Sequence, residues 1–167
     1  GQADYDDVLN ITWLADANYA WSSGYDSGGN MTWSEAQAWS GTLNNGNHLG
    51  VADWRLPTTV DTGTVGCDWA YSGTDCGYNV QTMSGSTVYS EMAHLYYVTL
   101  GNSGYYNTSG SPTGCQASPL GPPCKANDGP FSNVHYFNYW SGTEFGSLQA
   151  WYFNFDVGAQ DFNLKDD

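Results

Sequence analysis

The sequence predicts an α+β domain with two helices and a C-terminal part that is rich in strands. Two segments carry apolar residues at helical spacing between recognisable start and stop signals, whereas the C-terminal segment alternates apolar and polar residues. Stretches rich in Gly, Ser, Asn and Pro separate these elements and indicate long surface loops. A length of 167 residues fits one hydrophobic core, so residues 1–167 are interpreted as a single domain.

Both predicted helices have clear ends. Residues 32–35 (Thr-Trp-Ser-Glu) have the spacing of a capping box, in which the Thr hydroxyl and the Glu carboxylate satisfy free backbone amides. We expect the first helix to run from there to about Leu43, where residues 44–46 (Asn-Asn-Gly) supply a left-handed stop. The second is predicted over residues 90–100 and stops at residues 101–102 (Gly-Asn). The expected inward residues are Trp33, Ala36, Trp39 and Leu43 in the first helix, and Met92, Leu95, Tyr96 and Leu100 in the second.

Three strands are predicted from alternating side chains. An opening strand over residues 8–14 directs Trp13 towards the core. A second strand covers residues 149–157, and Gly158 then turns the chain so that residues 160–164 pair with it as a hairpin. The inward face of the second strand consists of Trp151, Phe153 and Phe155.

The four cysteines lie in two pairs, and each pair is in a loop rich in Gly and Ser. We expect two local disulfides, Cys67 with Cys76 and Cys115 with Cys124, because neighbouring partners need the least chain ordering. Each closed ring would add about 2–3 kcal/mol, and the second would staple a long surface loop over residues 101–130. A zinc site is the competing interpretation, but zinc ligands usually come in pairs only about two to four residues apart. Disulfides predict an oxidising compartment, outside the cell.

The charge of the chain excludes several classes of partner. Its 3 basic and 17 acidic residues give a formal net charge of −14, which repels nucleic acid and anionic lipid surfaces. No segment approaches the roughly 20 apolar residues that span a bilayer, so membrane insertion is not expected. The residues after Gly1 do not resemble a signal sequence, and if the protein is exported this chain is a mature fragment.

No catalytic motif is present, and we predict that the protein is not an enzyme. The three histidines lie far apart, and the serines show no Gly-x-Ser-x-Gly pattern. Among 17 acidic residues some pair always lies at a glycosidase distance, so acidic pairs carry no specific signal. Calcium is the one cofactor that the chain offers ligands for, although no calcium-loop consensus is met and solvated acidic clusters explain the same residues. Its candidate ligands are Asp4, Asp6, Asp7 and Asp26, the last together with Asn30.

Three segments in order resemble one known family. They are residues 10–19 (Asn-Ile-Thr-Trp-Leu-Ala-Asp-Ala-Asn-Tyr), residues 54–58 (Trp-Arg-Leu-Pro-Thr) and residues 139–144 (Tyr-Trp-Ser-Gly-Thr-Glu). With them nearly the whole chain resembles the Lcl C-terminal domain family, named for the C-terminal domain of a collagen-like bacterial adhesin. The second segment also resembles one in formylglycine-generating enzymes and, more loosely, in C-type-lectin-like folds. The motif residues are Trp54, Arg55, Leu56, Pro57, Thr58, Trp140 and Glu144.

The resemblance implies a C-type-lectin-like fold, with a mixed, mostly antiparallel sheet, two helices and long disulfide-stapled loops. Two departures from the family pattern limit what it implies about function. The namesake adhesin is associated with sulfated glycosaminoglycans, which a net charge of −14 would repel. Relatives usually continue into a closing strand where this chain stops at residues 165–167 (Lys-Asp-Asp), so we expect an open sheet edge that a strand from another copy can join.

Two kinds of site residue are expected. Arg55 is the only arginine, and we expect a structural, bidentate pair with Glu35, Glu91 or Glu144. Loop aromatics can stack on sugar rings without any motif, although packing within the protein explains them equally well. The candidates are Tyr71, Tyr78, Tyr105, Tyr106 and Tyr136.

The leading hypothesis is a non-enzymatic extracellular or cell-surface bacterial domain for adhesion or surface assembly, with an extracellular glycan as its partner. The alternative is a structural subunit that forms homo-oligomers or a filament through the open edge strand. A formylglycine-generating-like oxidoreductase is a remote alternative, since that chemistry needs reactive cysteines and all four here are explained as loop staples.

Overall fold

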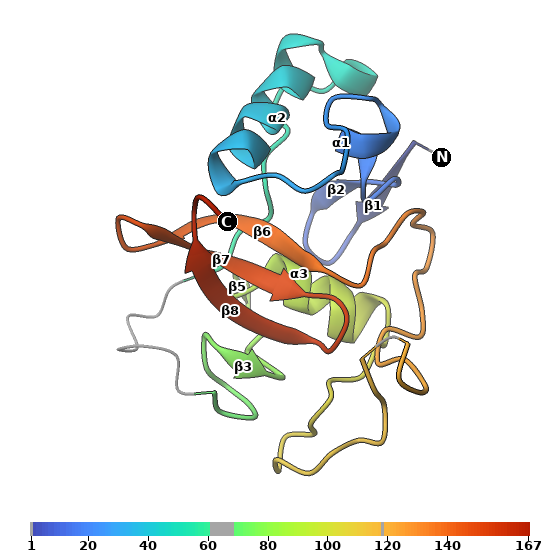
Figure 1. Cartoon of the computed structure of the whole chain (residues 1–167), viewed down its shortest axis with the longest axis vertical. Helices are drawn as coiled ribbons and strands as arrows, with labels where there is room; N and C mark the ends of the chain where they lie inside the picture. The colour runs from blue at the N-terminus through green and yellow to red at the C-terminus, as the bar shows by residue number, and fades with distance from the viewer. Residues whose placement is uncertain (1, 61–68, 118) are drawn as a thin grey trace.

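The computed structural model, which describes residues 2–60, 69–117 and 119–167, has the predicted α+β architecture. An upper layer holds the β1–β2 hairpin with helices α1 and α2, and the main sheet lies below it with helix α3 packed against the far face (Figure 1). The strands are β1 (Ala3–Asp6), β2 (Ile11–Leu14), β3 (Gly77–Tyr78), β4 (Met83–Ser84), β5 (Thr87–Val88), β6 (Asn138–Phe145), β7 (Gln149–Asn154) and β8 (Ala159–Leu164). The helices are α1 (Tyr19–Ser22), α2 (Trp33–Asn45), the 3-10 turn η1 (His48–Gly50), α3 (Glu91–His94) and the π-helical η2 (Leu95–Thr99).

The main sheet confirms the predicted C-terminal hairpin. Its strand order is β3-β8-β7-β6, and all neighbours are antiparallel. The three predicted inward residues of this segment, Trp151, Phe153 and Phe155, are buried at 1%, 0% and 5% exposure. Strand β7 ends at Asn154 and not at Val157, because the Asn154 side chain accepts the backbone amides of residues 156 and 157 and turns the chain early.

The predicted helix over residues 90–100 forms as α3 continued by η2, and it supplies the centre of the core. Its four predicted inward residues are buried and pack with Phe153 and Phe155 of the sheet. The Ser90 hydroxyl caps its start by accepting the amide of Ala93, and Gly101 ends it at a φ of +66° as expected.

Helix α2 begins at the predicted capping box, with both reciprocal bonds between Thr32 and Glu35 present. Of its expected inward residues, Ala36 and Leu43 are buried and the two tryptophans are half-buried. The predicted left-handed stop at residues 44–46 is wrong: the helix runs to Asn45, and the left-handed residue is Asn47. Asn44 stays helical because its side chain bonds the backbone N–H and C=O of Trp54.

The N-terminal prediction is correct only in part. Strand β2 covers the second half of the expected strand, and Trp13 packs against the core. The preceding residues form a turn, because the Asp6 carboxylate accepts the backbone amides of Val8 and Leu9. Strand β1 was not predicted, since residues 3–6 (Ala-Asp-Tyr-Asp) lack an apolar alternation. Helix α1 was not predicted either, because it is a single turn without a side-chain cap.

The edges of the main sheet differ from each other. Along β6, the carbonyl of Pro57 accepts the amide of Gly142 at 2.8 Å, so residues 54–58 lie against this edge. At the other edge, β3 pairs only with Ala159 and Gln160 of β8, and within the described ranges no strand pairs with the outer side of residues 161–164. No helix of the described residues is both long and apolar enough to cross a membrane.

Candidate functional site

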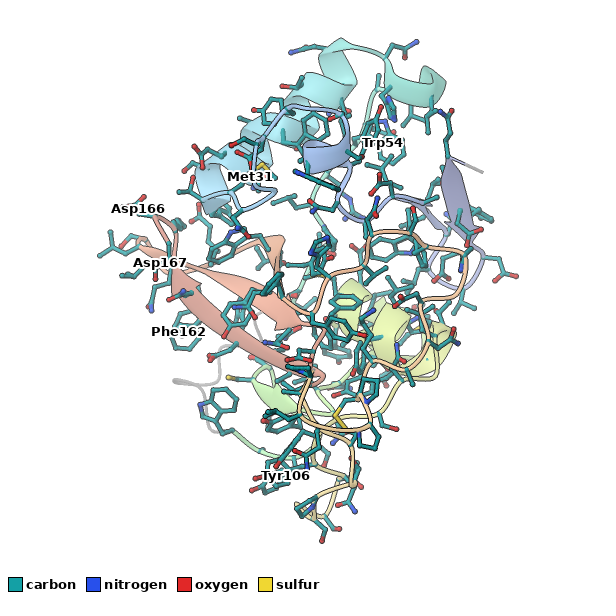
Figure 2. The ribbon with its side chains drawn as sticks, turned by 45° about the vertical axis from the view of Figure 1, so that its right-hand side comes forward. Met31, Trp54, Tyr106, Phe162, Asp166 and Asp167 are labelled. Atoms are coloured by element: carbon teal, nitrogen blue, oxygen red, sulfur yellow. A yellow bond between two sulfur atoms is a disulfide. The ribbon has the colours of Figure 1, made fainter. Side chains whose placement is uncertain are left out.

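Four of the five candidate sugar-stacking tyrosines come together. The ring centroid of Tyr106 lies 4.9 Å from that of Tyr105 and 5.0 Å from that of Tyr78. The Tyr71 ring lies 5.3 Å from Tyr106, and Trp69 adds an indole 6.4 Å from Tyr78. Tyr71 and Trp69 are 40% and 47% exposed, so these five residues, which we call the tyrosine cluster, reach solvent. Tyr106 lies at the end of the molecule opposite helix α2 (Figure 2).

Two loops that are distant in the sequence are joined at the tyrosine cluster. The Asn79 carboxamide donates to the backbone carbonyls of Tyr71 at 3.0 Å and of Tyr106 at 2.8 Å. Gly110, at a φ of +80°, packs against the Tyr71 ring so closely that a Cβ there would lie 2.6 Å from Cε2. Burial, together with the neighbouring phenols, raises the pKa of Tyr78. The Tyr78 phenol therefore stays uncharged at physiological pH.

A disulfide restrains the loop beside the cluster, as predicted. Cys115 and Cys124 are bonded, with their Cα atoms 4.8 Å apart. Near this bond, the backbone amide of Thr113 donates to the carbonyl of Tyr105 at 3.0 Å, so the stapled loop is tied to the cluster. The other predicted pair includes Cys67, which lies outside the described residues, so the Cys67–Cys76 bond stays a prediction.

Tyr136, the fifth candidate, lies apart from the tyrosine cluster, and its role as a sugar-stacking residue stays a prediction. Within the described residues it has no ring contact with the other four tyrosines, and it is 39% exposed. The Lys125 ammonium lies 4.5 Å from its ring centroid. Sequence position alone does not separate Tyr136 from the others, because it too lies between the predicted elements.

All three basic side chains of the protein are in ion pairs. The pairs are Arg55 with Glu91 at 2.7 Å, Lys165 with Glu144 at 3.2 Å, and Lys125 with Asp128. A sulfate or carboxylate group would therefore have to displace an existing partner to find a cation. Ligand recognition by positive charge has no support in this arrangement.

The family motif residues form a structural joint. Glu91 is the carboxylate that pairs with Arg55, and the bidentate geometry is confirmed at 2.8 and 2.7 Å. The backbone amide of Thr58 donates to the same carboxylate at 2.7 Å. Pro57 bonds Gly142 of β6, so this joint connects residues 54–58 both to helix α3 and to the sheet. Of the remaining motif residues, Trp54, Leu56 and Trp140 line the cleft described below, and Glu144 pairs with Lys165.

The four aspartates considered for calcium are not gathered into one cluster in the part of the chain that the structure describes. Asp6 and Asp26 each accept two backbone amides of the turn that follows them. Asp4 lies in β1, and Asp7 is exposed in the turn after it. The part of the chain that the structure describes contains no group of three or more His, Cys, Asp or Glu side chains placed to hold a metal.

A large cleft, which no sequence pattern predicts, lies between the upper layer and the sheet. Its volume is about 1090 Å³. Tyr19, Trp39 and Trp54 line it from the upper layer. Trp140 and Tyr152 line it from the sheet face opposite helix α3. We call it the interlayer cleft; its walls come from segments that are far apart in the sequence.

Asp161 lies next to the sheet side of the interlayer cleft. Its carboxylate accepts the backbone amide of Phe162 at 2.8 Å and the Tyr152 hydroxyl at 3.4 Å. Burial raises the pKa of Asp161 in spite of these hydrogen bonds, and burial with the nearby carboxylate raises the pKa of Tyr152 to about 12.

Asp161→Asn is expected to stabilise the protein at neutral pH. Because the pKa of Asp161 is higher in the folded than in the unfolded state, its contribution is most favourable below the unfolded pKa and is lost as the pH rises through the folded pKa. An amide removes the buried charge: its oxygen can still accept the Phe162 amide, and its N–H can donate to the Tyr152 hydroxyl in place of the bond that Asp161 accepts. Thermal unfolding should show a gain at about pH 7 that shrinks at about pH 3. The exposed Asp166→Asn is the control, and an equal gain at both pH values would contradict the assignment.

Comparisons with known proteins place the chain in a family. Neither the curated proteins nor the solved structures contain a match to it. A family model described as the Lcl C-terminal domain matches residues 3–167, which include all the motif segments and the tyrosine cluster. The chain therefore belongs to the Lcl C-terminal domain family.

Proposed function

We propose that this domain is a non-enzymatic adhesion domain of the bacterial cell exterior that binds uncharged glycans at the tyrosine cluster. The observation that carries the proposal is the convergence of five aromatic rings from two distant loops, two of them substantially exposed. Aromatic faces stack on the C–H faces of sugar rings, and phenol hydroxyls add hydrogen bonds. Membership of a family named for an adhesin domain supports the same function.

The preference for uncharged glycans rests on charge. All three cations are paired, and the net charge of −14 repels sulfated or carboxylated polymers. The extracellular location rests on the Cys115–Cys124 bond, because structural disulfides persist in oxidising compartments. We further propose that the architecture is a C-type-lectin-like variant, which the antiparallel sheet, the packed helix and the long projecting loops support.

A glycan array tests the proposal. We expect retention on uncharged glycans and none on sulfated ones. Each stacked ring contributes about 0.5–1.5 kcal/mol, so the double variant Tyr71→Ala/Tyr106→Ala should bind about fivefold to a hundredfold more weakly. Tyr136→Ala is the matched control, because Tyr136 is similarly exposed but lies apart from the cluster. Unchanged binding by the double variant, or a preference for sulfated glycans, would contradict the proposal.

Gly110→Ala is expected to weaken glycan binding by displacing the Tyr71 ring. Its Cβ would come within 2.6–3.2 Å of three ring atoms, so the ring has to move. Gly114→Ala is the control, since Gly114 has a similar φ of +89° but open space around it. Both variants should lose about 1 kcal/mol of stability from backbone strain, while only Gly110→Ala loses glycan affinity. Equal affinities for the two variants would show that the position of the Tyr71 ring is unimportant.

A second candidate function is self-assembly through the outer edge of β8. Residues 161–164 have no strand partner on that side in the described ranges, and Leu148 and Leu164 nearby are 72% and 48% exposed. Unpaired strand edges with apolar neighbours are templates for strand addition. Light scattering should then show oligomers that Leu164→Lys disperses, whereas monomers at all concentrations would remove this candidate.

A further inference from the structure

We propose that the interlayer cleft is a second, separate saccharide-binding site, which takes consecutive sugar residues of an uncharged glycan. This inference rests on the proposed glycan-binding function and adds a site to it. The cleft and the tyrosine cluster lie apart: Met31 and Trp54, which line the cleft, belong to the upper part of the molecule, and Tyr106 lies near the opposite tip (Figure 2). One copy of the domain would then hold two glycan chains.

The aromatic side chains of the cleft are arranged to present ring surfaces. The indole N–H of Trp54 donates to the carbonyl of His48, and that of Trp140 donates to the carbonyl of Met31. Since these N–H groups are used inside the protein, the two rings are fixed in place. The Trp39 ring is supported by Tyr19 at 5.9 Å, and the Trp140 ring by Tyr152 at 6.2 Å. Fixed rings on both sides can stack on the faces of a sugar ring between them.

Polar groups without internal partners also line the cleft. The side-chain amides of Asn30 and Asn163 make no hydrogen bond within the described residues. Both carboxamides can donate to and accept from the hydroxyl groups of a sugar.

The charges of the cleft favour a neutral ligand over an ionic one. Its only cation, Arg55, is engaged by Glu91, so an anion finds no free partner. Two further carboxylates are also used internally: Asp16 accepts from Ser22 and Asn133, and Glu35 belongs to the capping box of α2. The acidic groups that remain at the cleft, Asp53 and Asp167, are exposed to solvent. Ring faces and the half-buried Asn163 amide, not free charges, line the interior, and Asn30 lies at its exposed rim.

The size of the cleft fits more than a single sugar ring. Pockets for drug-sized ligands have volumes of roughly 300–1,000 Å³, and this cleft has about 1090 Å³. An oligosaccharide segment can therefore enter with its rings between the upper layer and the sheet. The tyrosine cluster, in contrast, is a surface platform that any exposed part of a chain can approach.

An NMR titration tests the two sites separately. The eight tryptophan indole N–H signals of ¹⁵N-labelled protein show where a ligand binds. Trp39, Trp54 and Trp140 report on the cleft, and Trp69 reports on the tyrosine cluster. The probes are uncharged hexasaccharides of glucose, mannose, galactose and N-acetylglucosamine, and the cationic hexasaccharide of glucosamine. Each is added up to about 10 mM, so that a site with a Kd of about 1 mM is nearly saturated. The buried Trp151 is the internal reference.

We expect saturable shifts of the cleft indoles with an uncharged hexasaccharide, and at least a tenfold loss of affinity in Trp39→Ala and in Asn163→Ala. The second variant removes no internal hydrogen bond, so it keeps the test independent of folding; Asn45→Ala, on α2 but outside the cleft, should bind normally. Shifts confined to Trp69 would overturn the cleft site and leave the proposed function standing. Shifts confined to the cleft indoles would support the cleft site and overturn glycan binding at the tyrosine cluster. Tighter binding of the glucosamine probe would overturn the cleft proposal. The absence of a shift with every probe would overturn both the cleft proposal and glycan binding at the tyrosine cluster.

Discussion

Replacement of Arg55 by Ala should lower the free energy of unfolding by about 2–3 kcal/mol. The variant leaves the Glu91 carboxylate, 7% exposed, with only the Thr58 amide and no cation. Removing one partner of a buried pair costs about 3–5 kcal/mol, and we expect less because the Arg55 side chain is 50% exposed and water screens the pair. For a domain of this size the melting temperature should fall by about 4–12 °C, measured by circular dichroism.

Two further variants show that the loss comes from an uncompensated carboxylate. Arg55→Ala/Glu91→Gln should be more stable than Arg55→Ala alone, because no buried charge is left unpaired. Glu144→Ala breaks an ion pair whose carboxylate side chain is 56% exposed, and it should cost less than about 1 kcal/mol. If Arg55→Ala costs no more than Glu144→Ala, the joint between residues 54–58 and helix α3 does not depend on this pair.

The elements that the sequence predicts well are those whose signals are local. The capping box at Thr32 and Glu35 and the helix end at Gly101 depend on neighbouring residues and are confirmed. The alternation that buries Trp151 and Phe153 is also local, and it sets the register of the hairpin. Where a side chain redirects the backbone, local patterns fail: Asn154 ends β7 early, and Asp6 turns part of the expected first strand into a loop.

The features that need three-dimensional proximity could be predicted only in part. Charge and geometry make Arg55 pair with some carboxylate, but only the fold selects Glu91, which lies 36 residues away along the chain. The sequence identifies loop tyrosines as candidates, yet it neither adds Trp69 to the tyrosine cluster nor separates Tyr136 from it. The interlayer cleft has no local signal at all, because its walls are assembled from helices and strands that are far apart in the sequence.

Cys115→Ser/Cys124→Ser is expected to lower the free energy of unfolding by about 2–3 kcal/mol. A bond between residues nine positions apart restricts the unfolded chain to this extent, and the surrounding loop has few other restraints. Denaturant unfolding of the oxidised wild type and the double variant measures the difference. The substitution of an exposed loop serine, Ser109→Ala, should leave stability within about 0.5 kcal/mol and serves as the control.

The same double variant should also bind glycans more weakly, because the loop that it loosens is tied to the carbonyl of Tyr105 through Thr113. A mobile Tyr105 and Tyr106 have to be ordered on binding, which costs about 0.5–1.5 kcal/mol for each side chain. The affinity should therefore fall about threefold to tenfold at a temperature where the variant is still folded. Full affinity in the variant would mean that the staple serves stability alone. A loss would mean that the tyrosine cluster is complete only where the Cys115–Cys124 bond persists, which ties glycan binding to an oxidising environment.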